Sequence, residues 1–105
     1  MSKIKYEALN SANVKVNNSN DLSKTYDIEA NANVTQNNVV SNIDSGRVTL
    51  DGVEKATFNS WGDNMLNISY SNVEAEEQCA IISAVNAFIK ELKSHVADTP
   101  IVASL

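Results

Sequence analysis

Residues 65–96 read MLNISYSNVEAEEQCAIISAVNAFIKELKSHV, and the spacing of their apolar positions changes partway along. From Leu66 to Tyr70 every second residue is apolar, which is typical of a β-strand with one buried face. From Ile81 onward the apolar positions recur at intervals of three and four residues, as they do along one face of an α-helix. The stretch therefore predicts a final strand followed by a C-terminal helix.

The limits of this helix are indicated by flanking residues. Ser71 and Glu74 are spaced as a capping box, in which the hydroxyl and the carboxylate satisfy backbone N–H groups at a helix start. Pro100 disfavours helical backbone in the residue before it. We therefore expect the helix at about residues 72–96, followed by a tail at 97–105. Its expected buried stripe consists of Ile81, Ile82, Val85, Phe88, Ile89, Leu92 and Val96.

Upstream of the helix, a period of two dominates the sequence. It is cleanest from Thr25 to Thr35, and it also runs from Ile4 to Val16, where we expect one long strand or two pieces around a bend near Asn10-Ser11. The polar stretch 17–24 is expected to form a loop. Further extended segments are expected at 39–43, at 47–60 with a bulge or tight turn at Asp51-Gly52, and at 65–70.

These elements predict a single α+β domain over residues 1–105. We expect an antiparallel β-meander of four to five strands, all within residues 3–70, packed against one long C-terminal helix. A helix of this length covers only part of such a sheet, because the alternating segments supply a large apolar face. The uncovered remainder has to curl on itself or meet another subunit, and we therefore expect a homo-oligomer.

Charge and apolar content exclude several partners. The net charge of −5 lies entirely in residues 51–105, which carry three basic and eight acidic groups. The chain has one Arg and no basic cluster, so it lacks the cationic surface that binding to nucleic-acid phosphates requires. No apolar run approaches the roughly 20 residues of a membrane span. We expect neither direct nucleic-acid binding nor a membrane partner.

Cysteine use and the N-terminal residues bear on location. Cys79 is the only cysteine, so no disulfide forms within the chain and a disulfide-stapled secreted domain is excluded. Met1 to Lys5 lack the apolar segment of a signal peptide. Both features favour a cytoplasmic location, in the producing cell or in a host cell. Asn occupies 15 positions, a composition that fits a bacteriophage or bacterial accessory protein.

No motif for catalysis, a metal or a cofactor stands out, and we expect none of the three. Cys79 and His95 lie sixteen residues apart on the predicted helix, too far for a nucleophilic pair. Cys79 is expected to be a small buried hydrophobe at the edge of the stripe. The acidic residues at the helix start are explained by favourable interaction with the helix dipole.

Candidate protein-binding residues are an aromatic side chain at a predicted hairpin tip and the acidic groups of the second half: Trp61, Glu54, Asp63, Glu76 and Glu77. The Trp61 ring is expected either to fold back onto the sheet or to anchor a partner. The sequence thus favours a small acidic, non-enzymatic protein-binding or assembly module that acts as a homo-oligomer and binds another protein.

The order of elements also resembles that of SecB-type export chaperones, which implies a tetramer that binds unfolded chains. The apolar-Pro-Tyr-Ala-Arg stretch at the start of that family's helix has no counterpart from Val73 to Ala80, so no residue roles are transferred. A further alternative is an acidic decoy that inhibits a host protein by occupying its basic nucleic-acid-binding surface. A small-molecule enzyme or carrier would need a deep pocket with inward-facing polar side chains.

Overall fold

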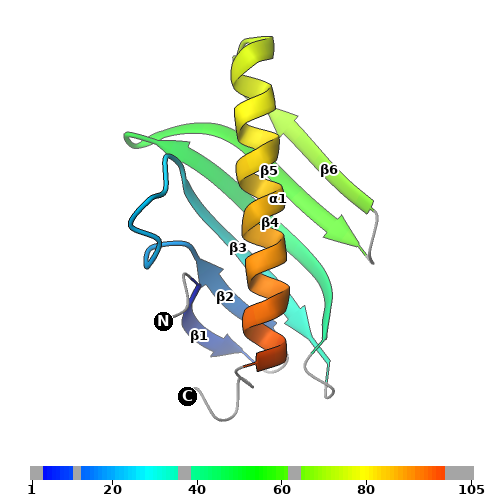
Figure 1. The fold of residues 1–105 in the computed structure, drawn as a ribbon. Helices are drawn as coiled ribbons and strands as arrows, with labels where there is room; N and C mark the ends of the chain where they lie inside the picture. Colours follow the sequence, from blue (N-terminus) through cyan, green and yellow to red (C-terminus); the bar gives the residue numbers. More distant parts are fainter. Residues whose placement is uncertain (1–3, 11–12, 36–38, 62–64, 99–105) are drawn as a thin grey trace.

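The computed structural model describes residues 4–10, 13–35, 39–61 and 65–98, of which residues 5–10 and 98 are described by their backbone alone. These residues form one antiparallel sheet with strands in sequence order, crossed on one face by a single helix (Figure 1). The elements are β1 (Lys5–Asn10), β2 (Asn13–Asn17), β3 (Asp27–Val34), β4 (Val40–Leu50), β5 (Val53–Trp61), β6 (Met65–Tyr70) and α1 (Ala75–Asp98). The predicted α+β fold, an antiparallel meander packed against one C-terminal helix, is confirmed.

The described sheet has six strands, one more than the upper end of the expected range. The alternating segment 4–16 forms two of them, because β1 ends at Asn10 and β2 returns beside it. Asp51 and Gly52 form the tight turn between β4 and β5, with positive φ angles of 53° and 82°. Ser45 also has a positive φ, of 52°, but β4 continues through it as a bulge.

The helix starts three residues later than predicted. Asn72 adopts a left-handed φ of 57°, which is incompatible with a helix running from Ser71. The Ser71 N–H instead donates to the Lys55 carbonyl at 2.9 Å, extending the pairing of β5 and β6. The first helical hydrogen bond joins the Gln78 N–H to the Glu74 carbonyl at 2.9 Å, so Glu74 occupies the N-cap position. The prediction that Ser71 and Glu74 form a capping box is therefore wrong.

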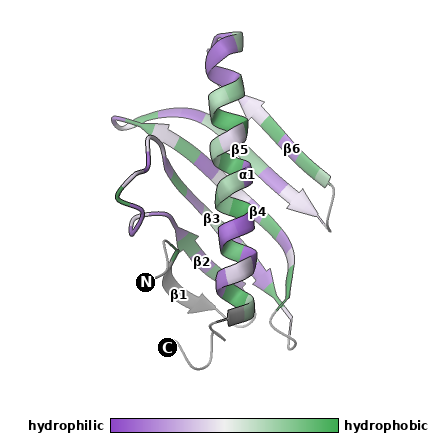
Figure 2. Ribbon diagram, viewed as in Figure 1, coloured by the Kyte–Doolittle hydropathy of each residue, from purple (hydrophilic) through white to green (hydrophobic). Residues whose placement is uncertain are grey.

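The core lies between the helix and the concave face of the sheet. Hydrophobic and hydrophilic residues alternate along the strands, and one stripe of the helix faces the sheet (Figure 2). Side chains with no exposed surface come from both layers: Val14, Val16, Ala32, Val48, Ile81, Val85, Leu92 and Val96. One helix thus buries the apolar face of β2 to β5 within a single chain, and the uncovered apolar area is smaller than expected.

Two features of the sheet explain this coverage. Register shifts in the pairing of β3 with β4 and of β4 with β5 mark bulges, which increase the twist of a sheet and here wrap it around the helix. Several core positions on the strands hold only Ala: Ala30, Ala32 and Ala56. Such short side chains need little covering surface and let the helix approach the sheet closely.

A glycine-to-aromatic contact fixes the centre of the core. Gly46 in β4 lies opposite Phe58 in β5, and a Cβ atom on Gly46 would lie 2.6 Å from the Phe58 carbonyl oxygen and 2.7 Å from its ring carbons. The Phe58 ring meets the Phe88 ring of the helix edge to face, with centroids 6.3 Å apart. The helix therefore packs through Phe88 on the Phe58 ring, and the position of the Phe58 ring requires glycine at position 46.

Two helix positions differ from the expected stripe. Ile82 is 40% exposed, although its neighbour Ile81 is fully buried. Cys79 is exposed, so its expected burial is wrong. Both residues lie on a flank of the helix that the sheet does not reach, because successive residues are rotated by about 100° around the helix axis.

Candidate functional site

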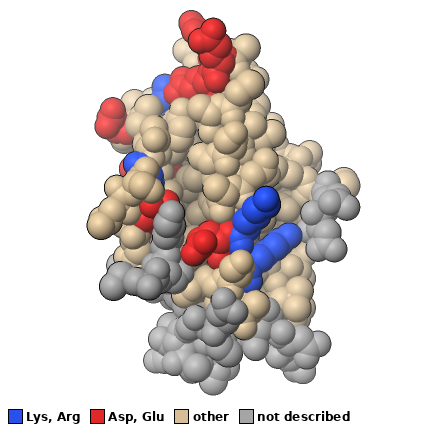
Figure 3. Space-filling view, in the orientation of Figure 1, with Lys and Arg blue, Asp and Glu red and all other residues tan. Residues whose placement is uncertain are grey.

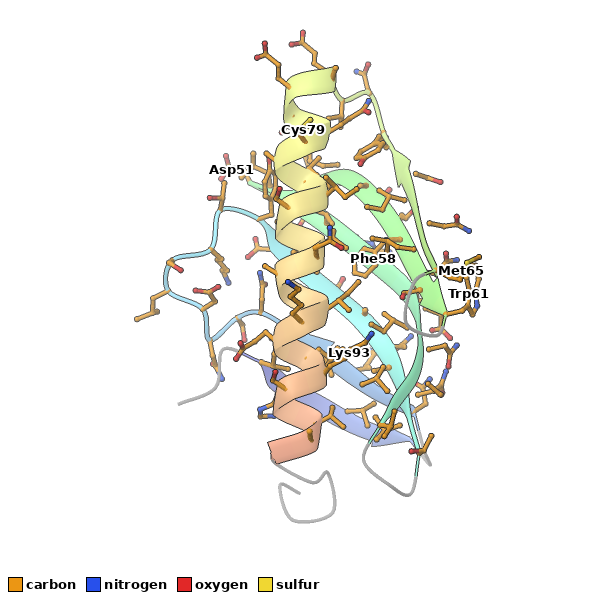
Figure 4. The ribbon with its side chains drawn as sticks, turned by 45° about the vertical axis from the view of Figure 1, so that its right-hand side comes forward. Asp51, Phe58, Trp61, Met65, Cys79 and Lys93 are labelled. Atoms are coloured by element: carbon orange, nitrogen blue, oxygen red, sulfur yellow. The ribbon has the colours of Figure 1, made fainter. Side chains whose placement is uncertain are left out.

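The sequence-predicted binding residues lie at two opposite ends of the molecule. Trp61 ends β5 and is 43% exposed beside Met65, which is 60% exposed at the start of β6 (Figure 4). Glu54 begins β5, and Glu76 and Glu77 lie in the first turn of α1. Seven residues of extended strand, about 23 Å, separate Glu54 from Trp61. The structure therefore does not bring Trp61 together with the three acidic candidates that it describes, and Asp63 lies outside the described residues.

Glu77 has a structural role that the sequence did not indicate. Its Oε2 accepts a hydrogen bond from the Tyr26 hydroxyl at 3.3 Å and lies 3.7 Å from Lys55 Nζ. Burial of Tyr26, together with the charge and hydrogen bond of Glu77, raises the pKa of that phenol above 10.0. Glu77 thus links the helix to β5 and to the residue that precedes β3.

The acidic groups do not form one continuous surface. Acidic groups lie over the N-terminal turn of α1, at one side of the molecule, and beside the basic groups over the C-terminal half of the helix (Figure 3). Glu54 pairs with Arg47 at 3.1 Å, and Glu29 lies 3.6 Å from the same guanidinium. Glu54 and Glu29 therefore share one guanidinium, which offsets part of their charge.

The outer side of β6 is an unpaired strand edge. Within the residues that the structure describes, no strand pairs with this side of β6, which forms one margin of the sheet (Figure 1). Among the described strands, β6 is also the one without Asp, Glu, Lys or Arg. Natural proteins commonly protect exposed edges with charges or proline. An edge of six residues with neither is available for pairing with another strand.

Partly exposed apolar side chains accompany this edge. Leu66, Ile68 and Tyr70 point toward the helix side and pack against the core, yet all three are only half-buried. The Tyr70 hydroxyl donates to the Gln78 carbonyl at 3.5 Å, and Ile82 lies one helical turn beyond Gln78 on the same face. We call these four residues, Leu66, Ile68, Tyr70 and Ile82, the β6 strip. Its three strand residues are apolar positions of the sheet that the helix covers only partly.

The opposite face of the sheet is polar and carries a ladder of asparagines. Asn13 Nδ2 donates to Asn33 Oδ1 at 2.8 Å, and Asn33 Nδ2 donates to Asn42 Oδ1 at 2.6 Å. The same cross-strand row continues through Trp61 to Met65. Several of the many asparagines therefore stabilise the sheet by side-chain pairing, a role that composition alone did not indicate.

Two hollows on the surface have polar groups that are largely satisfied. A groove of about 410 Å³ separates the helix from the 18–26 loop; in it, Asp21 Oδ1 accepts from the Ser23 hydroxyl at 2.7 Å, and Lys24 pairs with Asp27. A polar hollow of about 550 Å³ lies over the β4 bulge, and its charged member Arg47 is paired as above. Asn59 Oδ1, beside this hollow, is buried without a hydrogen-bond partner. Neither hollow forms a recognisable reaction centre.

No family model, curated protein or solved structure matches the chain. The resemblance to SecB-type chaperones therefore remains a likeness in the order of elements. Within the described ranges, no three His, Cys, Asp or Glu side chains are placed to hold a metal ion. The one helix among the described residues is not apolar enough to cross a membrane.

Proposed function

We propose that this chain is a non-enzymatic protein-binding and assembly module, in which the β6 edge accepts an extended strand from another polypeptide. The observation that carries the proposal is the combination of an uncharged, unpaired edge with the half-exposed β6 strip beside it. Strand addition uses the main-chain N–H and C=O groups for affinity and alternate side chains for specificity. The outer edge of β6 offers unpaired main-chain groups, and its alternate side chains belong to the β6 strip.

The two faces of an added strand would meet different surroundings. Its side chains on the helix side would contact Leu66, Ile68 and Tyr70, which favours an apolar residue at every second position. Its other side chains would lie beside Met65, Asn67 and Ser69, all exposed on the polar face. The expected partner segment therefore alternates apolar and uncharged polar residues.

The proposal is tested with a labelled peptide, Gln-Ser-Ile-Ser-Val-Ser-Ile-Gln, and a control in which the central Val is replaced by Pro. Fluorescence anisotropy should show saturable binding of the first peptide and none of the second, because Pro removes a ladder donor. Ser69→Lys, on the edge strand, should weaken binding by about tenfold or more.

Thr57→Lys is the matched control variant. Thr57 is the direct cross-strand neighbour of Ser69 on the same exposed face, but it lies in β5, one strand inside the edge. It should leave peptide affinity unchanged. Equal affinity of the Ser69→Lys and Thr57→Lys variants, or equal binding of the proline peptide, would contradict strand addition at β6.

A further inference from the structure

We propose that the strand received by the β6 edge is β6 of a second copy of this chain, paired antiparallel about a two-fold axis normal to the sheet. This inference rests on the proposed function and names its partner. The two sheets would join into one continuous sheet with both helices on the same face. The argument rests on the register of the strand, the choice of edge and the placement of charge.

The sequence of β6 is self-complementary in one register. Residues that face each other across two strands must point to the same side of the sheet. With Ile68 opposite Ile68 of the other copy, Leu66 lies opposite Tyr70 on the helix side, and Asn67 lies opposite Ser69 on the polar side. Every apolar residue of the β6 strip on the strand then gains an apolar neighbour, and no charge is buried.

The other edge of the sheet is a poorer choice. Strand β1 contains Lys5 and Glu7, whereas β6 contains no charged residue. Pairing of β6 with β1 of another copy would be heterologous and would extend into an open fibre. Pairing of β6 with itself closes after two copies and leaves the charged β1 strands outermost.

The antiparallel arrangement also keeps the acidic ends apart. Each copy carries a net charge of −5, with Glu74, Glu76 and Glu77 near the end of β6 where Tyr70 lies. In the proposed register the two Tyr70 residues are four strand positions apart, or about 13 Å. This separation exceeds the Debye length of about 8–10 Å at physiological ionic strength, so repulsion between the two acidic clusters is screened.

The size of the contact sets the expected affinity. A strand of six residues is about 20 Å long, and the smallest extent of the molecule is 20 Å, which gives a contact of about 400 Å² on each copy. The total of about 800 Å² is below the roughly 1,200–2,000 Å² of stable complexes, so we expect a dissociation constant in the micromolar range.

The experiment is sedimentation equilibrium of the full chain from about 2 to 300 µM, a range chosen to span weak association. The wild type should shift from the monomer mass of 11.4 kDa toward twice that value. The double variant Asn67→Lys/Ser69→Lys places like charges opposite each other in two symmetric pairs, and it should stay monomeric. Asn67→Lys/Ser69→Glu places opposite charges in the same pairs, and it should dimerise at least as well as the wild type.

The two double variants alter the same exposed positions, so circular dichroism should show both folded. A wild-type mass of 11.4 kDa throughout, or equal association of both variants, overturns the second copy as the partner. If the wild type stays monomeric and yet binds the Gln-Ser-Ile-Ser-Val-Ser-Ile-Gln peptide, strand addition stands and the occupant belongs to another protein. If neither event occurs, both proposals fail.

Discussion

Replacement of Gly46 by Ala should be among the most damaging single-methyl changes in this chain. The added Cβ would lie 2.6 Å from the Phe58 carbonyl oxygen and 2.7 Å from two ring carbons, which is closer than van der Waals contact allows. The ring could rotate away only by losing its contact with Phe88, and the carbonyl belongs to the paired strand β5. Overpacking of a tight core costs about 1–3 kcal/mol, and the backbone clash places this change at the upper end, about 2–3 kcal/mol.

The assay is thermal unfolding followed by circular dichroism. For a domain of this size about 1 kcal/mol lowers the Tm by roughly 4–8 °C, so Gly46→Ala should lower it by about 10–20 °C. Gly52→Ala is the control, because Gly52 has a positive φ of 82° but nothing within 4 Å of the added atom. It should cost only the roughly 1–2 kcal/mol of a left-handed residue. A Gly46→Ala Tm equal to or above that of Gly52→Ala would refute the packing argument.

Three further changes test other parts of the structure. Ile81→Ala should lower the free energy of unfolding, measured by urea titration, by about 2–5 kcal/mol, because Ile81 is fully buried. Ile82→Ala should lower it by under about 1 kcal/mol, because Ile82 is 40% exposed. Similar losses in the two variants would contradict the assigned orientation of the helix. Asn18→Ala should lower the free energy of unfolding by about 2–4 kcal/mol in the same assay. The reason is that Asn18 Nδ2 donates to the Tyr26 carbonyl and Asn18 Oδ1 accepts from the Ile28 N–H, both at 2.9 Å. A loss below about 1 kcal/mol would show that these two hydrogen bonds do not stabilise the fold as argued. The raised pKa of Tyr26 means that the unfolded chain releases this proton at a lower pH than the folded chain, so the stability that Tyr26 contributes is fully present below about pH 9 and is lost as the pH rises through the folded-state pKa. Tyr26→Phe should therefore lose less stability between about pH 9 and pH 11, and an equal fall in both proteins would show that Tyr26 is not the cause.

The sequence predicted the strands well because alternation is a local property of extended backbone. Val14, Ile28 and Phe58 all face the core as their positions in the alternating pattern indicate. The polar 17–24 stretch was also predicted correctly, since Asp21 Oδ1 accepts from the Ser23 N–H at 3.0 Å as expected for a turn of this composition.

The errors concern features that depend on distant partners. The helix start was misplaced because Asn72 takes a left-handed conformation while Ser71 bonds to Lys55 on a neighbouring strand. Coverage of the sheet was underestimated because bulges in β3, β4 and β5 wrap the sheet around the helix, and periodicity does not show how far a sheet curls. The side-chain hydrogen bond between Asn13 and Asn33 was not predicted, because it depends on the register of two strands whose paired residues are twenty positions apart in the sequence.

The candidate site was only partly indicated by the sequence. Trp61 was predicted at a hairpin tip, and it ends β5, partly exposed beside Met65. The lack of charge in β6 is visible in the sequence, where 39–43 and 65–70 are both predicted strands without a charge, but its importance depends on the sheet order that leaves β6 at the edge. The acidic candidates Glu54 and Glu77 are held in ion pairs, which composition does not reveal.

Amide hydrogen exchange, measured residue by residue at about 5 µM and about 300 µM, tests the edge pairing most directly, since the two concentrations bracket the micromolar association expected for a contact of this size. Protection of the outward-pointing amides of Leu66, Ile68 and Tyr70 should rise with concentration, because N–H groups alternate in direction along a strand and that of Ser71 points to β5. The interior strands β3 and β4, which are already paired on both sides, should be unchanged. Unchanged exchange across β6, or a rise confined to another surface, would contradict the assignment of this edge as the docking strand.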